Sequence, residues 1–515
     1  QDDLHYITDF LLDFNRTFKE VHNINALLGY SIEKSTSETL SGKRGDTPSN
    51  YIRYLDAGDP NTSTNGNNYI EWAFLSTFAR VGYSYKDKYY INGTIRRDGT
   101  SRLIKNKYGA FPSVSAAWRI TEESFMENFN WLNELKLRMS YGTVGNVQSI
   151  TPYGTAVYLS QKNAVFNQKV TVGYTFANAV NTNLKWESTT KKNLGLDISV
   201  LRNRLYFIGD YYEEDTRDLL FEQPIPYSVG LSGSPYINAG LVRNRGFDIE
   251  LGWRDVVSDW KYDINANFTH VKNKVIDLEG RNLMTSGIKE GYPVRSFFGY
   301  KSNGLIRTQE DLDSNPQYPG KNIGDIWLLD IDSYDADGNL TGKRDGKVDA
   351  ADRTLFSDVF PDFSYGIFGS IGYKSLTLQV QLQGISGIKK NMLNGGWVTD
   401  RFNGEPNMEA DYILDRFHIT KNPDGKYPKV DASDSGQNGL FSDFWLVDAS
   451  YLSIRNINLS YNFPARFANK LSSRDLSVYC GVQNLWTFGN EYAEISSTVS
   501  VPIPRPITFG LKFSF

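Results

Sequence analysis

The stretch RPITFGLKFSF, residues 505–515, alternates apolar side chains with polar or small ones along its length. A period of two residues predicts a β-strand, because successive side chains leave a pleated backbone on opposite sides. A soluble protein would bury the apolar face of this strand against another layer, whereas a membrane protein can leave it against lipid. The apolar face holds Ile507, Phe509, Leu511, Phe513 and Phe515.

The same alternation recurs along the chain, for example in KNLGLDISV (192–200), RGFDIELGW (245–253) and LTLQVQLQG (376–384). Near Leu452 and Ile454 the alternation reverses, which indicates either a β-bulge or the point where a strand leaves a bilayer. The pattern predicts fifteen strands, at residues 2–17, 21–34, 70–86, 88–97, 113–120, 134–143, 188–200, 204–214, 245–254, 259–273, 363–373, 375–386, 451–463, 474–486 and 505–515.

The composition leaves membrane residence open and excludes other classes. The chain has 515 residues and a net charge of −4, so it lacks the basic footprint of a nucleic-acid-binding protein. Its mean hydropathy is −0.44, and no apolar run approaches the ~20 residues of a membrane helix. A membrane β-barrel also has low hydropathy, because half of each strand faces a polar lumen. The single cysteine, Cys480, excludes a disulfide within the chain.

Short turns alternate with long polar stretches between the predicted strands. This asymmetry is typical of outer-membrane barrels, whose turns are short on the periplasmic side and long outside the cell. The sequence therefore predicts an all-β fold: one transmembrane antiparallel β-barrel portion over residues 1–515, with its main loop insert at 273–362 and a second at 387–443. The other long stretches are 35–69, 144–187, 214–244 and 487–504.

The strand count predicts that the chain is part of a larger barrel. Bacterial single-chain barrels have an even number of strands, and fifteen is odd. The first residues, QDDLHYITDFLLDFN, alternate like a strand and show no signal-peptide pattern. We therefore expect this sequence to be a C-terminal portion, preceded by at least one more strand.

Several stretches, taken together and in this order, resemble the SusC-like and RagA-like TonB-dependent outer-membrane transporters of Bacteroidota. The resemblance covers nearly the whole chain. The stretches are RRDGTSRLIKNKYGAFPSVSAAWRITEESFM (96–126), LKLRMSYGTVGN (135–146), YYEEDTRDLLF (211–221), NAGLVRNRGFDIEL (238–251), YLSIRNINLSYNFP (451–464) and GVQNLWTF (481–488).

The resemblance implies a 22-stranded barrel whose N-terminal plug domain is absent from this sequence. It implies active import of oligosaccharides or oligopeptides across the outer membrane, without chemical change to the cargo, so the protein is not expected to be an enzyme. The implied partners are a SusD-like surface lipoprotein, the TonB–ExbB–ExbD complex acting through the plug, outer-membrane lipid, and a second transporter–lipoprotein pair in a dimer. The alternatives are a passive porin and a secreted β-rich glycan-binding or adhesin protein.

One acidic loop, residues 325–353, predicts a calcium or magnesium site. Calcium loops place oxygen ligands at positions 1, 3, 5, 7 and 12, with glycine at position 6. Gly346 fits position 6 and Val348 the apolar position 8, provided that residues 333–344 bulge out of the loop. The predicted ligands are Asp330, Asp332, Asp345, the carbonyl of Lys347, and Asp352.

Two other interpretations of this loop remain open. A second register uses Asp335, Asp337 and Gly338 directly. The simpler alternative is an acidic, turn-rich loop that is only solvated.

No catalytic or substrate-binding residue can be assigned from the sequence. The four histidines, at positions 5, 22, 270 and 418, lack metal-ligand spacing. Four loop aromatics are possible platforms for cargo, but they can equally pack the loops or meet the lipoprotein. They are Trp327, Trp397, Tyr412 and Trp445.

Overall fold

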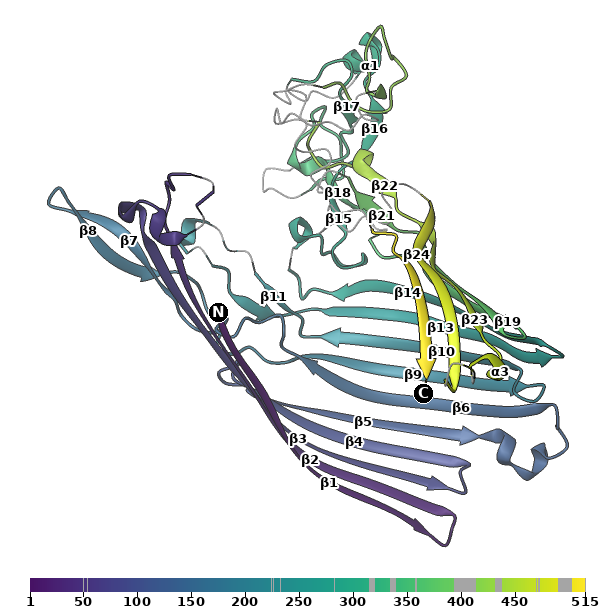
Figure 1. Cartoon of the computed structure of the whole chain (residues 1–515). Helices are drawn as coiled ribbons and strands as arrows, with labels where there is room; N and C mark the ends of the chain where they lie inside the picture. Colours follow the sequence, from purple (N-terminus) through teal and green to yellow (C-terminus); the bar gives the residue numbers. More distant parts are fainter. Residues whose placement is uncertain are drawn as a thin grey trace. The chain divides into compact units, whose positions relative to one another are not determined.

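The structure of the chain is a computed structural model in which β-strands dominate (Figure 1). The chain forms two compact units, one made of residues 1–129, 135–196 and 212–243 and the other of the remaining residues. Within the part of the chain that is described, no helix is long and apolar enough to cross a membrane. The structure describes all residues except 50, 53, 224, 226, 232, 282, 315–319, 334–339, 357–358, 393–413, 431–437, 469, 471–472, 490–502 and 515.

Fifteen long strands form one antiparallel sheet, in which neighbours follow the order of the chain. The number agrees with the fifteen predicted strands, and β2 and β3 extend furthest beyond their predicted ends. The strands are β1 (Asp2–Phe18), β2 (His22–Lys43), β3 (Thr64–Tyr85), β4 (Tyr89–Thr100), β5 (Tyr108–Arg119), β6 (Leu132–Asn146), β9 (Glu187–Val200), β10 (Leu205–Arg217), β13 (Leu241–Val257), β14 (Trp260–Asp277), β19 (Phe363–Tyr373), β20 (Leu376–Ser386), β23 (Tyr451–Asn462), β24 (Asp475–Gly489) and β25 (Ile507–Ser514).

Tight turns fix the register of the hairpins at one end of the strands. Lys19 and Glu20 between β1 and β2 have φ values of 49° and 60°, and Lys86 and Asp87 between β3 and β4 both have 51°. Two consecutive positive φ values are the mark of a type I′ turn, whose twist matches that of the flanking strands. From these turns β2 and β3 pair without a break from His22–Tyr85 to Lys43–Thr64.

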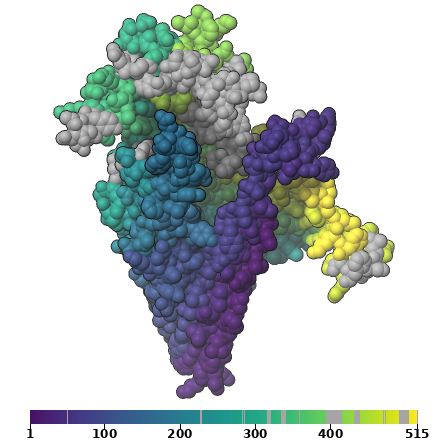
Figure 2. All heavy atoms as spheres, turned by 90° about the vertical axis from the view of Figure 1, so that its left-hand side faces the viewer, coloured from purple at the N-terminus to yellow at the C-terminus, as the bar shows by residue number. Residues whose placement is uncertain are grey.

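In the first unit β1 to β5 run side by side (Figure 1), and their purple-to-blue residues lie next to one another in the space-filling view (Figure 2). Each of these strands carries an apolar face and a polar face. On the apolar face Leu28 of β2 and Ile95 of β4 lie on either side of β3 and are 57% and 55% exposed. On the opposite face Asn25 and Asn92 lie in register across β3. No described layer covers the apolar face, as expected for a surface that contacts lipid.

β2 and β3 are each 22 residues long. A tilted strand crosses the hydrocarbon core in about 9–11 residues, so roughly half of each strand must extend past it. Glu33 and its cross-strand neighbour Phe74 lie in this second half, far from the tight turns. Side chains on the polar face of this second half therefore lie at the entrance of a barrel.

The predicted irregularity near Ile454 is a β-bulge. The register of β23 shifts between Ile454 and Asn456 against both neighbouring strands, so Arg455 lies at the shift. The Arg455 guanidinium donates to Gln383 Oε1 at 3.1 Å and to Asn484 Oδ1 at 3.3 Å. The reversal in the sequence therefore marks an inserted residue, which turns the strand over.

The long connections contain structure that the sequence did not predict. Five two-stranded sheets lie within them: β7 (Leu159–Phe166) with β8 (Lys169–Phe176), β11 (Leu220–Glu222) with β12 (Tyr236–Asn238), β15 (Phe297–Tyr300) with β18 (Arg353–Phe356), β16 (Ser302–Leu305) with β17 (Ile326–Leu328), and β21 (Lys389–Asn391) with β22 (Leu446–Asp448). The short helices and 3₁₀ turns are η1 (Leu55–Ala57), η2 (Pro60–Thr62), η3 (Ile120–Glu122), η4 (Ser124–Met126), η5 (Tyr227–Val229), η6 (Met284–Ser286), α1 (Gln309–Ser314), η7 (Ala350–Asp352), η10 (Asp443–Trp445) and α3 (Ala465–Ala468).

Each unit has a small hydrophobic core, built largely from its connections. In the first unit the core residues are Leu103, Val147, Ile150, Leu184, Trp186 and Leu220. In the second unit they are Tyr300, Leu305, Ile326, Leu328, Val348, Phe417 and Trp445. These cores make the loops of each unit compact bodies rather than solvated tethers.

We expect the two faces of β2 to tolerate charge very differently. Leu28→Lys places an ammonium group on the apolar face near the middle of the membrane-crossing part, where it costs about 2–4 kcal/mol. Asn25→Lys, on the polar face of the same strand, is the matched control and is expected to change stability little. Urea unfolding of the protein in lipid vesicles measures the difference, and equal effects of the two substitutions would contradict the assignment of the faces.

Candidate functional site

A pocket of about 520 Å³ lies on the polar face of the first unit. Its wall is formed by alternate residues of β3 (Trp72, Phe74 and Ser76) and by Arg96 and Asp98 of β4. These side chains share a face because β3 and β4 pair in register, with Ser76 opposite Asp98. Period-two alternation on neighbouring strands thus gathers aromatic and charged groups into one concave surface.

Aromatic rings form one side of the pocket. The Trp72 and Phe74 rings meet edge to face at 5.5 Å, and Phe74 meets Trp186 at 6.3 Å. Trp186 is 9% exposed, and its indole donates to the carbonyl of Lys107 at 3.1 Å. Leu103 and the rest of the first unit's core pack behind it. The aromatic side of the pocket is therefore supported by packed residues.

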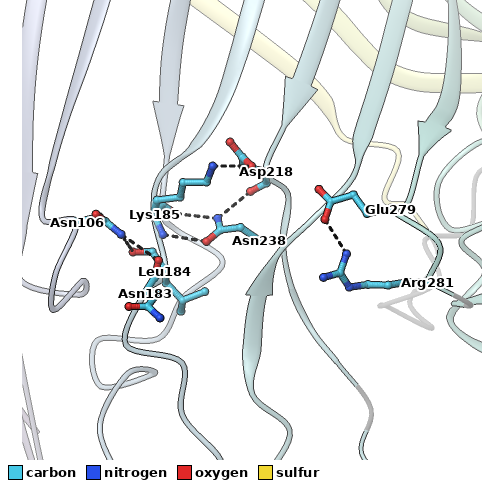
Figure 3. A network of polar contacts seen from close by, with 8 residues as sticks. All are labelled: Asn106, Asn183, Leu184, Lys185, Asp218, Asn238, Glu279 and Arg281. Atoms are coloured by element: carbon cyan, nitrogen blue, oxygen red, sulfur yellow. Dashed lines mark hydrogen bonds and ion pairs between the residues drawn. The ribbon is translucent and has the colours of Figure 1, made fainter.

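A polar network holds the segment that carries Trp186 (Figure 3). The Asn106 amide donates to the carbonyl of Leu184 at 3.1 Å. Asn238 and Lys185 exchange two bonds of 2.8 Å, from the Lys185 amide to the Asn238 side chain and from that side chain to the Lys185 carbonyl. The Lys185 ammonium pairs with Asp218 at 3.0 Å. Reciprocal bonding to the backbone on both sides of Leu184 restricts the position of the neighbouring tryptophan.

Figure 3 also shows a separate ion pair of the second unit, between Arg281 and Glu279 at 2.9 Å. Both side chains are partly exposed to solvent. Pairs of this kind contribute little to stability, so we assign it no role in the site.

Three of the pocket's charged groups have partners. Arg96 Nε contacts Asp98 Oδ1 at 2.7 Å, and the same guanidinium donates to Ser76 Oγ at 2.8 Å. Glu33 Oε1 lies 3.5 Å from His5 Nε2. These contacts fix the polar side chains on the strands that carry them.

Arg102, in the connection between β4 and β5, is placed differently. Its guanidinium carbon lies 5.4 Å from the Trp72 ring centroid and 6.0 Å from that of Phe74. One terminal nitrogen donates to the Ile150 carbonyl at 2.8 Å, and the buried Nε has no hydrogen-bond partner among the described residues. Burial lowers the pKa of Arg102, but a guanidinium remains protonated in proteins.

In the acidic loop of the second unit, Asp330 contacts Gly346, the glycine of the predicted register. Asp330 is 5% exposed; its Oδ2 accepts from the Gly346 amide at 2.8 Å, while its buried Oδ1 has no partner in the described chain. Gly346 has a φ of +84°, which suits the predicted turn position. Val348 is 4% exposed and packs in the second unit's core, as its predicted position requires.

The other predicted carboxylates bind backbone amides. Asp352 is fully buried, with Oδ1 accepting from Ile331 and Asp332 at 2.7 and 3.1 Å and Oδ2 accepting from Asp349 at 2.7 Å. Bonds from backbone amides, first of all that of Ser333, lower the pKa of the Asp332 carboxyl.

Asp345 lies nearer solvent than the buried carboxylates of the loop, and its Oδ1 accepts from the amide of Lys347 at 3.0 Å. No group of three or more His, Cys, Asp or Glu side chains in the described residues is arranged to hold a metal ion. The alternative ligands Asp335 and Asp337, with Gly338, fall outside the described residues.

Two of the four loop aromatics, Trp445 and Trp327, lie in the described part of the chain. Trp445 is 2% exposed, and its indole donates to the Asn438 carbonyl at 3.0 Å, so it is a core residue of the loops and no platform for cargo. Trp327 is half-buried between Ile326 and Leu328. Trp397 and Tyr412 lie outside the described residues.

Comparison with known proteins identifies the family. Residues 1–485 match the family model described as TonB dependent receptor-like, beta-barrel. The chain therefore belongs to the TonB-dependent receptors, which are β-barrel transport proteins of the outer membrane and not enzymes. This assignment confirms the family, the barrel fold and the location predicted from the sequence, and it excludes a secreted adhesin.

Individual relatives place the chain near the SusC-like members. It is 30% identical to TonB-dependent receptor P3 of Formosa agariphila, over 99% of this chain and 52% of that protein. It is 27% identical to TonB-dependent receptor SusC of Bacteroides thetaiotaomicron, over 86% of this chain and 44% of that protein. A solved structure of the RagAB peptide transporter matches 94% of this chain and 52% of its own with 25% identity and a TM-score of 0.76. The chain spans about half the length of these relatives.

The buried Asp352 carboxylate gives a test of how the acidic loop is organised. Asp352→Ala leaves three backbone amides without their acceptor, which is expected to cost about 2–4 kcal/mol locally. Asp345→Ala, which removes a less buried carboxylate from the same loop, is the matched control and is expected to cost less than 1 kcal/mol. Limited proteolysis of the loop measures the change, and equal cleavage of both variants would show that Asp352 does not hold the loop.

Proposed function

We propose that this chain forms part of the barrel wall of a SusC-like active transporter, which imports oligosaccharides or oligopeptides across the outer membrane. The observation that carries the proposal is the family match over residues 1–485, on a sheet with one apolar and one polar face. A barrel wall of this kind separates lipid from a polar lumen without altering the cargo chemically.

The proposed partners follow from the relatives. A SusD-like lipoprotein would meet the loops at the cell surface, and the TonB–ExbB–ExbD complex would act through a plug domain. Two transporter–lipoprotein pairs would associate as a dimer. The compact loop cores of both units support a role in contacting partners, because packed loops present a defined surface.

The class of cargo is suggested by one solved relative and by the pocket on the polar face. The RagAB structure is that of a peptide transporter, and its resemblance to this chain favours peptides. The pocket on the polar face combines aromatic rings with charged and polar groups, a composition that suits either peptides or sugars. We therefore propose both classes of oligomer and assign neither.

We also propose that the acidic loop binds calcium or magnesium through the oxygens of Asp330, Asp332, Asp345 and Asp352 and the carbonyl of Lys347. The buried Oδ1 of Asp330 supports this, because an ionised oxygen without a partner is stabilised by a cation. Gly346 and Val348 support the same register. The ion would hold the loop closed and take no part in transport chemistry.

Active transport is expected to depend on TonB. In cells that carry the full-length protein, deletion of TonB or collapse of the proton gradient should reduce uptake of labelled oligomer to the level of cells without the transporter. Uptake that continues unchanged would favour the passive porin. A general porin substrate, measured in the same cells, controls for damage to the membrane.

Calcium is expected to raise the unfolding midpoint of the protein by roughly 3 °C relative to EDTA, because a ligand that binds only the folded state stabilises it. Asp330→Asn should abolish this shift. Asp313→Asn, in the nearby helix α1 and exposed, should keep it. A midpoint that does not respond to calcium or magnesium in the unaltered protein would contradict the metal site.

A further inference from the structure

Among the described residues, one cation that lines the pocket of the first unit, Arg102, is not neutralised by its neighbours. Within the part of the chain that the structure describes, Arg102 has no carboxylate within ion-pair distance, whereas Arg96 is paired with Asp98. The shortest side-chain hydrogen bond of Arg102 to a described residue is to a neutral group, the Ile150 carbonyl, at 2.8 Å. A partly buried charge without a counter-charge is costly unless a ligand supplies one.

Aromatic contacts hold this guanidinium at the pocket wall. The rings of Trp72 and Phe74 face it at 5.4 and 6.0 Å, which stabilises the cation through the ring quadrupoles without neutralising it. The backbone of Arg102 is held as well, because its carbonyl accepts from Thr155 Oγ1 at 3.0 Å and its amide donates to Thr100 Oγ1 at 3.3 Å. The charge is thus positioned before any ligand arrives.

The remaining charges of the pocket determine where an anion can bind. Asp98 is neutralised by Arg96 at contact distance. Glu33 has only His5 as an ion-pair partner among the described residues, at 3.5 Å, so its negative charge stays largely available. Among the residues that the structure describes, the pocket therefore presents one cation without a counter-charge, Arg102, and one competing anion, Glu33.

We propose that Arg102 binds a carboxylate of the transported oligomer and sets a preference for acidic cargo. The inference rests on the proposed transport function and adds a specificity-determining residue to it. Because one terminal nitrogen donates to the Ile150 carbonyl and Nε is buried, the carboxylate would bind the other terminal nitrogen, Nη2, and the space of about 520 Å³ admits one acidic sugar ring or one acidic amino-acid residue. Glu33 opposes the same anion and limits its affinity.

Binding of matched acidic and neutral probes to the full-length purified transporter tests the proposal. One pair is trigalacturonic acid and its methyl ester, and the other is a hexapeptide with a central Glu and its Gln counterpart. Arg102→Gln is expected to weaken binding of the acidic member about tenfold or more, with less than a twofold change for the neutral member. If Arg102→Gln weakens binding of the acidic sugar alone, the carboxylate of the cargo comes from a sugar. If it weakens binding of the acidic peptide alone, the carboxylate comes from an amino-acid residue.

Two further variants separate recognition from folding. Arg102→Lys keeps the charge but loses the planar guanidinium that bonds Ile150 and faces the Trp72 ring, so it should retain part of the preference. Glu33→Gln should strengthen binding of the acidic probe, an effect that a purely structural role for Arg102 does not produce. Heat-modifiable gel mobility checks that each variant forms a barrel.

The proposal is overturned if acidic and neutral probes bind equally, if Arg102→Gln weakens both alike, or if none of the four probes binds at millimolar concentration. TonB-dependent uptake of the neutral probe, measured in the same variants, reports on transport itself. Uptake that persists while the acidic preference is absent would reject the role of Arg102 and leave the transport function standing.

Discussion

The alternation of side chains across a paired strand is the constraint on which the rest of this structure depends. Pairing fixes which residues face which way, and a slip of one residue would move every apolar side chain to the polar face. Continuous pairing of β2 with β3 over 22 residues leaves no such freedom. The exposed apolar face, to which Leu28 belongs, would be an aggregation hazard in water and is suited to lipid.

The same constraint places binding groups on rigid elements. Trp72, Phe74 and Arg96 occupy strands, so their positions follow from the ladder and not from loop conformation. The loops contribute Arg102 and Trp186, and the first unit's hydrophobic core anchors both segments. A transporter with this arrangement would recognise its cargo with a surface that is largely formed in advance, which limits the entropy lost on binding.

The strands and the family could be predicted from the sequence because both depend on local patterns. Period-two alternation predicted the number of strands in the main sheet, and its reversal near Ile454 indicated an irregularity that the structure shows to be a bulge. The shortest loop sheets, such as β11 with β12, were missed because three paired residues are too few to show a period, whereas β8 (Lys169–Phe176) does alternate and was missed inside a predicted loop. Their pairing is decided by packing between segments that are distant in sequence.

The pocket was missed for a similar reason. Glu33, Trp72 and Trp186 come from separate segments, and Arg96 and Arg102 lie in the stretch 96–126, which indicated the family and not a pocket. The sequence instead drew attention to loop tryptophans, and one of them, Trp445, is buried in a core. A cross-strand register, known only once the pairing partners are known, was the signal that would have brought the strand residues together.

The acidic loop shows what the spacing of carboxylates in a sequence can and cannot predict about a metal site. A carboxylate oxygen is a suitable acceptor for either a cation or a backbone amide, and sequence spacing does not distinguish the two. In Asp352 both oxygens accept amide bonds, so much of its charge is already satisfied by the fold. In Asp330 one oxygen is buried without any described donor, although it lies in the same loop. Only a buried carboxylate oxygen without a donor requires a partner from outside the described chain. For this reason Asp330, more than the number of aspartates, makes the loop a candidate for metal binding.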